Sequence, residues 1–318
     1  MIIYVFKRLL AVVAVLVVIS MLVFAVTQVM PGDVAHTIAG QFATPEVIEA
    51  IRVKLGLNDS VLVQYWRWMS GILQGDFGQS IVMERPVGTL IVEAFSASAA
   101  LAIVSFLCVS VLGVLLGVVA AVRRDKLVDH VVSGFSYIGI SIPEFFWGIV
   151  LIIFFANYLQ WLPSGGIGSF TTSPGDWLAH LVLPVTTLTL TLVAHVSRLT
   201  RSSMLETLES QYVKNARAKG LSESAVVFGH ALPNALMPTI TVLALDIGWL
   251  IGGIVVVEMV FSYPGIGRLL MFAIERHDLP LIQASILLIA LIYCLANLAA
   301  DLLYAIVNPK IRYGNAAE

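Results

Sequence analysis

Charged residues are scarce in this sequence. They make up 12% of the 318 residues, whereas hydrophobic residues make up 59%, and the mean hydropathy is +0.94. A soluble domain of this length has no core large enough to hide so much apolar surface. The composition therefore excludes an ordinary soluble protein and predicts an all-α integral membrane protein.

Cysteine and clustered histidine are also nearly absent. The two cysteines, Cys108 and Cys294, both lie inside apolar runs, which favours small buried side chains over a disulfide or a metal pair. No two of the six histidines are three or four residues apart, and none neighbours a cysteine. We therefore expect no metal site and no cofactor.

Motifs for nucleotide chemistry and catalysis are missing. The sequence has no G-x-x-x-x-G-K-[ST] phosphate loop and no Gly-Lys dipeptide at all. It also has no G-x-S-x-G or H-E-x-x-H pattern. These absences argue against a membrane-embedded enzyme and against ATP hydrolysis by this chain.

Long apolar runs are what the sequence does have. The first, Leu9–Met30, is too long for a signal peptide and lacks a small-x-small cleavage site, so we expect a retained spanning helix. Five more candidate spans follow at 94–122, 134–160, 178–201, 235–257 and 279–305. Pro143 and Glu144 interrupt the third of the six spans. Six spans without an internal repeat, and with isolated acids, fit an ion-coupled secondary transporter poorly.

The basic residues predict the orientation. With a cytoplasmic N-terminus, twelve lie inside: Lys7, Arg8, Arg123, Arg124, Lys126, Arg198, Arg201, Lys214, Arg217, Lys219, Lys310 and Arg312. Six lie outside: Arg52, Lys54, Arg67, Arg85, Arg268 and Arg276. Because positive charge is enriched in cytoplasmic loops, we expect both termini in the cytoplasm.

This orientation divides the chain into two parts. Residues 1–93 hold the first span and an extracytoplasmic segment with amphipathic patterning, in which Thr44 is a candidate N-cap and Gly56 a candidate helix stop. Residues 94–318 hold five spans and a cytoplasmic loop at about 202–234.

That cytoplasmic loop contains the stretch YVKNARAKGLSES, residues 212–224. The spacing of Leu205, Leu208, Tyr212 and Ala216 predicts one helix face, and that of Ala225, Phe228, Leu232 and Leu236 predicts a second. Between them Gly220 predicts a left-handed helix end, after which Ser222 can cap the next helix and Glu223 complements its dipole. The hairpin either lies on anionic lipid or docks a partner.

Two acids in or near spans and one outer loop are further candidates. Asp246 either lines a pathway or is a structural partner for a nearby group such as His195. Glu144 either faces the same path or is solvated near the interface. The stretch SYPGIGRLL after the fifth span carries a turn signal at Pro264-Gly265.

Several segments together carry a family resemblance. YVKNARAKGLSESAVVFGHALPNALMP resembles the cytoplasmic EAA loop of ABC-importer permeases. Further resembling stretches are MPGDVA, LGLNDSVLVQYWRW, GDFGQS, SIPEFFWG and VVVEMVFSYPGIGRLL, in order along the chain. They resemble the B-type permeases of the dipeptide, oligopeptide and nickel importers. Pro233 departs from the family pattern, which usually has arginine there.

The resemblance implies a type I ABC-importer permease in a bacterial inner membrane, most simply for di- or oligopeptides, with nickel chelates, glutathione or oligosaccharides as alternatives. Its implied partners are a second, homologous permease, two cytoplasmic ATPase subunits or domains, a periplasmic binding protein and the lipid bilayer, with no nucleic acid. The implied ATPase-coupling residues are Tyr212, Lys214, Ala216, Arg217, Ala218, Lys219, Gly220 and Leu221. The implied outer gate comprises Glu258, Tyr263, Pro264, Gly265 and Gly267.

Overall fold

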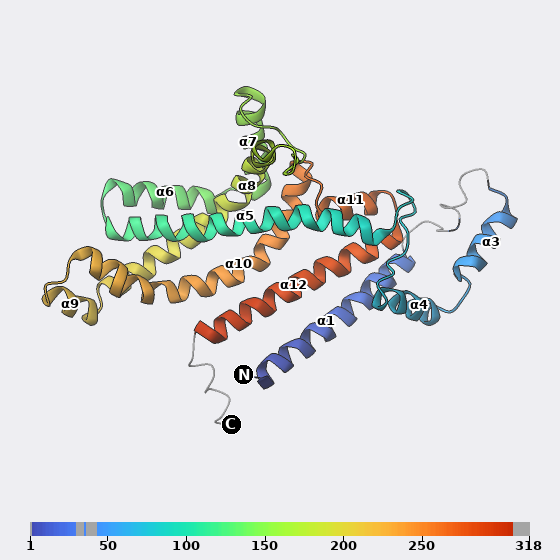
Figure 1. The fold of residues 1–318 in the computed structure, drawn as a ribbon, viewed down its shortest axis with the longest axis horizontal. Helices are drawn as coiled ribbons and strands as arrows, with labels where there is room; N and C mark the ends of the chain where they lie inside the picture. The colour runs from blue at the N-terminus through green and yellow to red at the C-terminus, as the bar shows by residue number, and fades with distance from the viewer. Residues whose placement is uncertain (1, 30–34, 36–42, 308–318) are drawn as a thin grey trace. The chain divides into compact units, whose positions relative to one another are not determined.

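A computed structural model describes residues 2–29, 35 and 43–307 of the chain (Figure 1). Within these ranges all regular elements are helices, and the only β-type pairing is one isolated bridge between Gln79 and Pro86. The chain forms two compact units, a larger one from 2–5, 98–263 and 295–307, and a smaller one from 6–97 and 264–294. The sequence expectations for residues 30–34, His36, Lys310 and Arg312 lie outside the described residues.

The larger unit is organised around two long helices, α8 (Pro174–Leu208) and α10 (Leu232–Val260), which pack against each other. Helix α5 (Val87–Val122) approaches α8 closely, because a Cβ at Gly117 would lie only 2.6 Å from the Ser197 carbonyl oxygen. Small residues at such crossings let two backbones approach in a membrane.

Five of the six predicted spans are continuous helices. Their apolar stretches are Val5–Val29, Val87–Val122, Pro174–Leu208, Ala225–Val260 and Leu279–Leu302. The first and last belong to α1 (Ile2–Val29) and α12 (Leu279–Val307).

The predicted span at 134–160 is a bent pair of helices, with the break at the interruption that Pro143 signalled. The chain forms α6 (Leu127–Ser141) and then α7 (Glu144–Leu151) with the π-helix η1 (Ile152–Tyr158), bent by 106° at the break. Pro143 explains the bend, because proline lacks an amide hydrogen and disfavours helical backbone in the residue before it. That residue, Ile142, is extended, with φ −102° and ψ 130°.

The smaller unit holds most of α1 and the predicted amphipathic segment. This segment forms α3 (Pro45–Leu55) and α4 (Val61–Leu73). Thr44 is the N-cap of α3, and Gly56 ends it in the left-handed region with φ 65°, so both predictions are confirmed. Helix α11 (Ile266–Glu275) and the start of α12 pack with the start of α5 around a buried apolar cluster.

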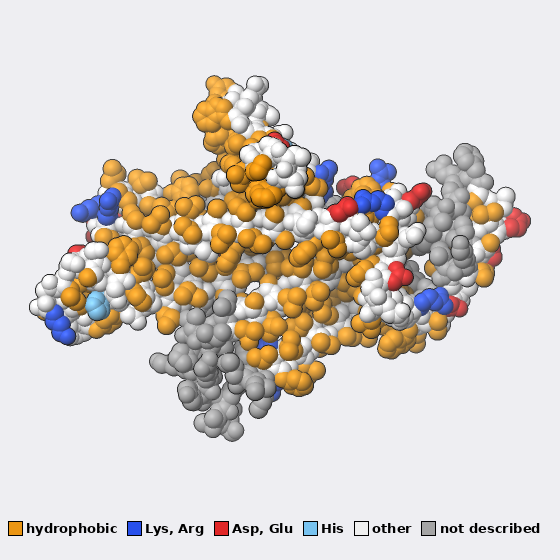
Figure 2. Space-filling model, viewed as in Figure 1, with side chains coloured by type: hydrophobic (Ala, Val, Ile, Leu, Met, Phe, Trp, Pro, Cys, Tyr) orange, Lys and Arg blue, Asp and Glu red, His pale blue; other side chains and the backbone are white. Residues whose placement is uncertain are grey.

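The surface of the larger unit suits a membrane. Hydrophobic side chains cover much of its visible face over α5, α6 and α10, whereas Lys and Arg gather where α5 meets α6 and around α9 (Figure 2). On α5, Ile103, Leu107 and Val111 are each about 60% exposed at a spacing of four residues, which places them on one helix face. This face suits contact with acyl chains.

Candidate functional site

The loop at 202–234 forms the predicted hairpin at one end of α8 and α10 (Figure 1). Helix α9 (Gln211–Ala218) is followed by a turn at Gly220 and by the π-helix η2 (Ala225–Ala231), which continues into α10. Gly220 has φ 79°, so the predicted left-handed conformation is confirmed. A Cβ at Gly220 would have no heavy atom within 4 Å, so any cost of a side chain there comes from the backbone conformation.

The hairpin is anchored to the long helices by a shared apolar cluster. Val213 from α9 and Val226 from η2 are completely buried, and so is Met204 from α8. Val118 and Ala121, near the end of α5, complete the contact. The hairpin is therefore packed directly against α5 and α8.

The structure corrects the predicted faces of both hairpin helices. Tyr212 is 44% exposed and Phe228 is 61% exposed, although both were expected on the apolar face. The first expectation fails because α8 ends at Leu208 and α9 begins at Gln211, so 205–216 is not one helix. The second fails because π-helical winding shifts the side chains that face inward.

Arg217 bridges the two sides of the hairpin turn. Its Nη2 lies 2.6 Å from Glu223 Oε1 and its Nε lies 3.1 Å from Glu223 Oε2, while Nη1 donates to the Leu208 carbonyl at 3.3 Å. This pairing lowers the pKa of Glu223 and raises that of Arg217. The sequence interpretation missed this contact; its only signal was opposite charge on either side of the Gly220 turn.

The outward surface of the hairpin mixes positive charge and apolar side chains. Lys214 and Lys219 are exposed and make no ion pair within the described part of the chain. Leu221 is 42% exposed beside them, and Ala218 is exposed as well. A groove of about 250 Å³ separates η2 from the end of α5. The arrangement leaves one face of the hairpin exposed while its opposite face is packed on the long helices.

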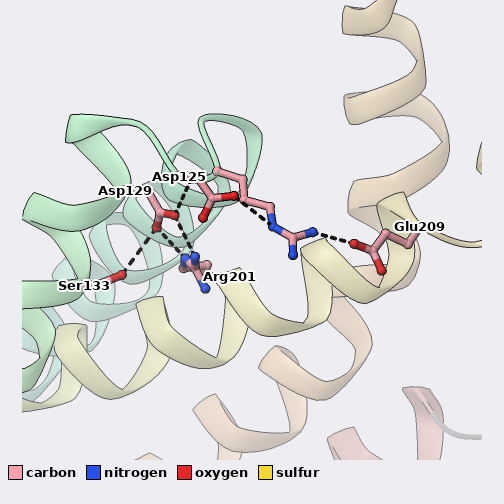
Figure 3. A network of polar contacts seen from close by, with 6 residues as sticks. Asp125, Asp129, Ser133, Arg201 and Glu209 are labelled. Carbon is pink, nitrogen blue, oxygen red and sulfur yellow. Dashed lines mark hydrogen bonds and ion pairs between the residues drawn. The ribbon is translucent and has the colours of Figure 1, made fainter.

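An ion-pair network centred on the buried Asp129 lies next to the hairpin (Figure 3). Arg201 of α8 binds Asp129 of α6 in a two-pronged contact, with Nε–Oδ1 at 2.5 Å and Nη2–Oδ2 at 2.6 Å. Asp129, which is 2% exposed, also accepts from the Asp125 amide and Ser133 hydroxyl. Arg124 connects the α5–α6 turn to Glu209 at 2.5 Å. The network fixes α6 and α8 where the hairpin begins.

The predicted outer-gate residues are mostly buried. Glu258 is 0% exposed and accepts a hydrogen bond from the Ser98 hydroxyl at 2.5 Å. Tyr263 is also 0% exposed, and burial raises its pKa to about 12. Gly265 and Gly267 are buried at the start of α11, whereas Pro264 is exposed.

The position of the turn differs from the expectation. The chain turns at Phe261-Ser262, where Ser262 has φ 49°, and Gly265 is extended with φ −96° and ψ −176°. Pro264-Gly265 therefore follows the turn. Gly265 does not adopt a conformation that only glycine favours.

Of the two acids chosen as pathway candidates, Asp246 belongs to α10 and Glu144 packs against it. Asp246 is 7% exposed, and its Oδ1 lies 3.5 Å from His195 Nδ1, so the expected histidine contact is confirmed. Its Oδ2 is buried without a hydrogen-bond partner. Glu144 occupies space next to Gly253, where a Cβ would lie 2.7 Å from each carboxylate oxygen. Asp246 and Gly253 are seven residues apart and share one face of α10, so both acids belong to one strip.

Metal ligation finds no support among the residues that the structure describes, which contain no group of three His, Cys, Asp or Glu side chains placed for an ion. The candidate site consists of the hairpin, the ion-pair network and the α10 strip.

Comparison with known proteins identifies the family. The family described as "Binding-protein-dependent transport system inner membrane component" matches residues 113–313, and its N-terminal counterpart matches residues 1–102. The chain belongs to this family of transport permeases. It is a permease subunit of a binding-protein-dependent ABC importer, as the resemblance in the sequence implied.

Individual relatives support this assignment, and one solved structure supports the fold. The "Probable peptide ABC transporter permease protein y4tP" of Sinorhizobium fredii is 40% identical, over 98% of this permease and 99% of its own length. The glutathione transport system permease protein GsiC of Escherichia coli is 42% identical over the same shares. The MetNI methionine ABC transporter structure matches with a TM-score of 0.55 at 20% identity, over 69% of this permease and 96% of that chain. At that identity the match supports the fold alone.

Proposed function

We propose that this permease couples ATP hydrolysis on a cytoplasmic partner to the import of short peptides. The observation that carries the proposal is the hairpin at 211–231. Its inner face is packed on α5 and α8, while its outer face leaves Lys214, Lys219 and Leu221 exposed. An ATPase that grips the outer face would move the membrane helices through the inner face.

The rest of the proposed assembly follows from the family. A periplasmic binding protein delivers substrate, a second homologous permease completes the pathway, and two ATPase subunits or domains bind the cytoplasmic side. Peptides are the proposed substrate because the y4tP and GsiC relatives are named for peptide and glutathione transport. Nickel chelates and oligosaccharides are the alternatives that the same machinery would serve.

The proposed orientation places the hairpin and both termini in the bacterial cytoplasm and the α10–α11 turn outside. It rests on the twelve basic residues inside against six outside. Reporter fusions after residues 75 and 170 should show export, and fusions after 125 and 220 should show retention. A cytoplasmic reporter at 75 would overturn the orientation.

Roles are also proposed for the two remaining groups. The buried turn residues Glu258 and Tyr263, with Pro264, Gly265 and Gly267, would close the pathway on the outer side. Asp246 and Glu144 would contribute polar groups to its wall, because buried carboxylates within membrane helices are costly unless they face protein or water.

The docking proposal is tested by charge reversal. The double variant Lys214→Glu/Lys219→Glu should stay in the membrane but lose association with the ATPase pair and lose peptide uptake. Lys126→Glu, which reverses one exposed charge at the N-terminus of α6, is the control for a charge reversal outside the hairpin and should keep both. If the hairpin lies on lipid instead, the double variant should lose affinity for anionic vesicles and keep normal uptake. That result would contradict the docking assignment.

The substrate is tested separately in vesicles with the cognate binding protein. Uptake of labelled di- and tripeptides, including glutathione, should exceed that of a nickel chelate or an oligosaccharide. Transport of the chelate or sugar alone would reject peptides and leave the permease assignment intact.

A further inference from the structure

A small polar cavity lies between α6 and α8, near the Asp129–Arg201 network. Its volume is about 170 Å³, several times the share of about 30 Å³ that one water occupies in the liquid. Its polar lining comes from Ser133, Ser136, Tyr137, Ser197, Arg198, Arg201 and Ser202. The hydroxyls of Ser133, Ser136 and Ser197 already bond to acceptors within the protein. No carboxylate belongs to the lining, so Tyr137, Arg198 and Ser202 supply the donors for a ligand, and the cavity suits an anion.

Only one of the two arginines is neutralised. Arg201 forms an ion pair with Asp129, whose carboxylate oxygens also accept hydrogen bonds from the Asp125 amide and the Ser133 hydroxyl. Arg198 lies 5.8 Å from the centre of the Tyr137 ring and has no carboxylate partner within the described residues. The cavity therefore keeps one positive charge without a counter-ion.

The face of α8 that carries Arg198 is polar and accessible. His195, Arg198 and Ser202 are all exposed, and their spacing of three and four residues places them on one helix face. The His195 side chain is 52% exposed and lies one turn deeper than Arg198, next to Asp246. A strip of this kind is costly against acyl chains. It contrasts with the apolar exposed face of α5, so we expect it to face an aqueous route.

We propose that Arg198 binds the C-terminal carboxylate of a peptide as the peptide passes along α8, with Tyr137 and Ser202 supplying hydroxyl donors. This inference rests on the proposed peptide transport function. A guanidinium presents two parallel N–H donors that match a carboxylate. Asp129 does not oppose binding because Arg201 neutralises it, and the deeper acid Asp246 is shielded by His195. An exposed site binds weakly enough to release the peptide.

The first experiment measures uptake into proteoliposomes that contain the complete importer. It compares a peptide that has a free C-terminal carboxylate with the same peptide carrying a C-terminal amide. Wild-type protein should transport the free acid about tenfold better, a ratio that one hydrogen bond to a charged group supports. Arg198→Gln should bring this ratio close to one, and Arg198→Lys should restore part of it. The matched control Arg123→Gln, an exposed arginine at the end of α5, should leave the ratio unchanged.

A change in the acid-to-amide uptake ratio between variants reports on the permease, because the same binding protein is used with every variant. If Arg198→Gln keeps uptake and keeps the wild-type acid-to-amide ratio, Arg198 does not bind the carboxylate, and the inference is overturned. If it lowers uptake of acid and amide by the same factor, the residue is only structural, and the inference is also overturned. If the wild-type importer transports no peptide at all, the proposed function fails first, which is a different result.

A second experiment needs no transport. It compares two single-cysteine variants, Ser202→Cys and Val131→Cys, in a protein whose Cys108 and Cys294 are replaced by alanine. Native Val131 lies on α6 and is 61% exposed. A membrane-impermeant thiol reagent should label position 202 and not position 131, and a free-acid peptide should protect position 202 more than its amide does. Absence of labelling at 202, or equal protection by both peptides, would overturn the site.

Discussion

A tyrosine and a glycine lie near each end of α10, but they differ in burial and in backbone conformation. Before α10 the hairpin contains Tyr212 and Gly220, and after it the outer turn contains Tyr263 and Gly265. Tyr212 is 44% exposed whereas Tyr263 is 0% exposed. Gly220 has φ 79°, which disfavours a side chain, whereas Gly265 has φ −96°, which any residue adopts. The hairpin thus leaves Tyr212 exposed, whereas the turn after α10 buries Tyr263 in the core.

The hydrogen bonds show the same contrast. The Tyr263 amide donates to the Glu258 carbonyl at 2.9 Å, and the Glu258 carboxylate is itself completely buried. In the hairpin, the Arg217–Glu223 pair is about half exposed, with side-chain exposures of 40% and 60%. Substitutions in the outer turn should therefore reduce stability, and those on the hairpin surface should reduce coupling at normal stability.

The largest effect is expected for Tyr263→Ala. Truncating a completely buried aromatic side chain costs about 3–5 kcal/mol, so the variant should give less folded protein after detergent extraction, measured by size-exclusion chromatography after a heating series. Tyr212→Ala should match the wild type in the same assay and lose uptake instead. Equal thermal losses in the two variants would remove the contrast between the two ends.

Gly220→Val should reduce stability less than Tyr263→Ala does, but it should abolish transport. Forcing a β-branched residue into a left-handed conformation costs on the order of 1–2 kcal/mol locally, which is too little to prevent membrane insertion. We expect normal membrane levels, no uptake, and an ATPase that is weakly associated or no longer stimulated by the binding protein. Gly220→Asn is the matched control, because asparagine tolerates this conformation, and it should keep most uptake. Wild-type uptake by Gly220→Val would defeat the coupling role.

A bulky side chain at Gly265 should affect only the outer side. The backbone accepts Gly265→Leu without strain, but position 265 is buried, so the new side chain must displace its neighbours. We expect several-fold slower uptake from the binding protein and unchanged ATPase association, with Pro264→Ala at an exposed neighbour as the control. Parallel loss of uptake and ATPase association would mean that the turn is needed only for folding.

Sequence patterns predicted those features that depend on composition or on one local conformation. Five continuous spans followed from apolar length, and the left-handed Gly220 followed from its place between two amphipathic stretches. The π-helix η2 was not predictable, because the same residues satisfy an α-helical pattern until packing selects the winding. The Arg217–Glu223 contact crosses a turn, so helical spacing rules do not apply to it. The broken third span was signalled by Pro143, but its 106° bend depends on tertiary packing.

The smallest effect is expected where the hairpin closes on itself. Arg217 lowers the pKa of Glu223 below its ordinary 4.5, so the ion pair stabilises the hairpin at pH values above 4.5 and is lost as the pH falls through the lowered value. Exposed pairs of this kind contribute about 0–1 kcal/mol. Hydrogen exchange of the 211–231 segment, corrected for intrinsic rates, should be slightly faster in Glu223→Gln than in the wild type at pH 7. The difference should vanish in acid, because the wild-type carboxyl is then protonated as well. Glu206→Gln removes an exposed acid with no ion pair in the described structure, and it should leave exchange unchanged at both pH values. A difference that persists in acid would assign the protection to packing around Val213 and Val226, and the two ends of α10 would then both depend on buried contacts.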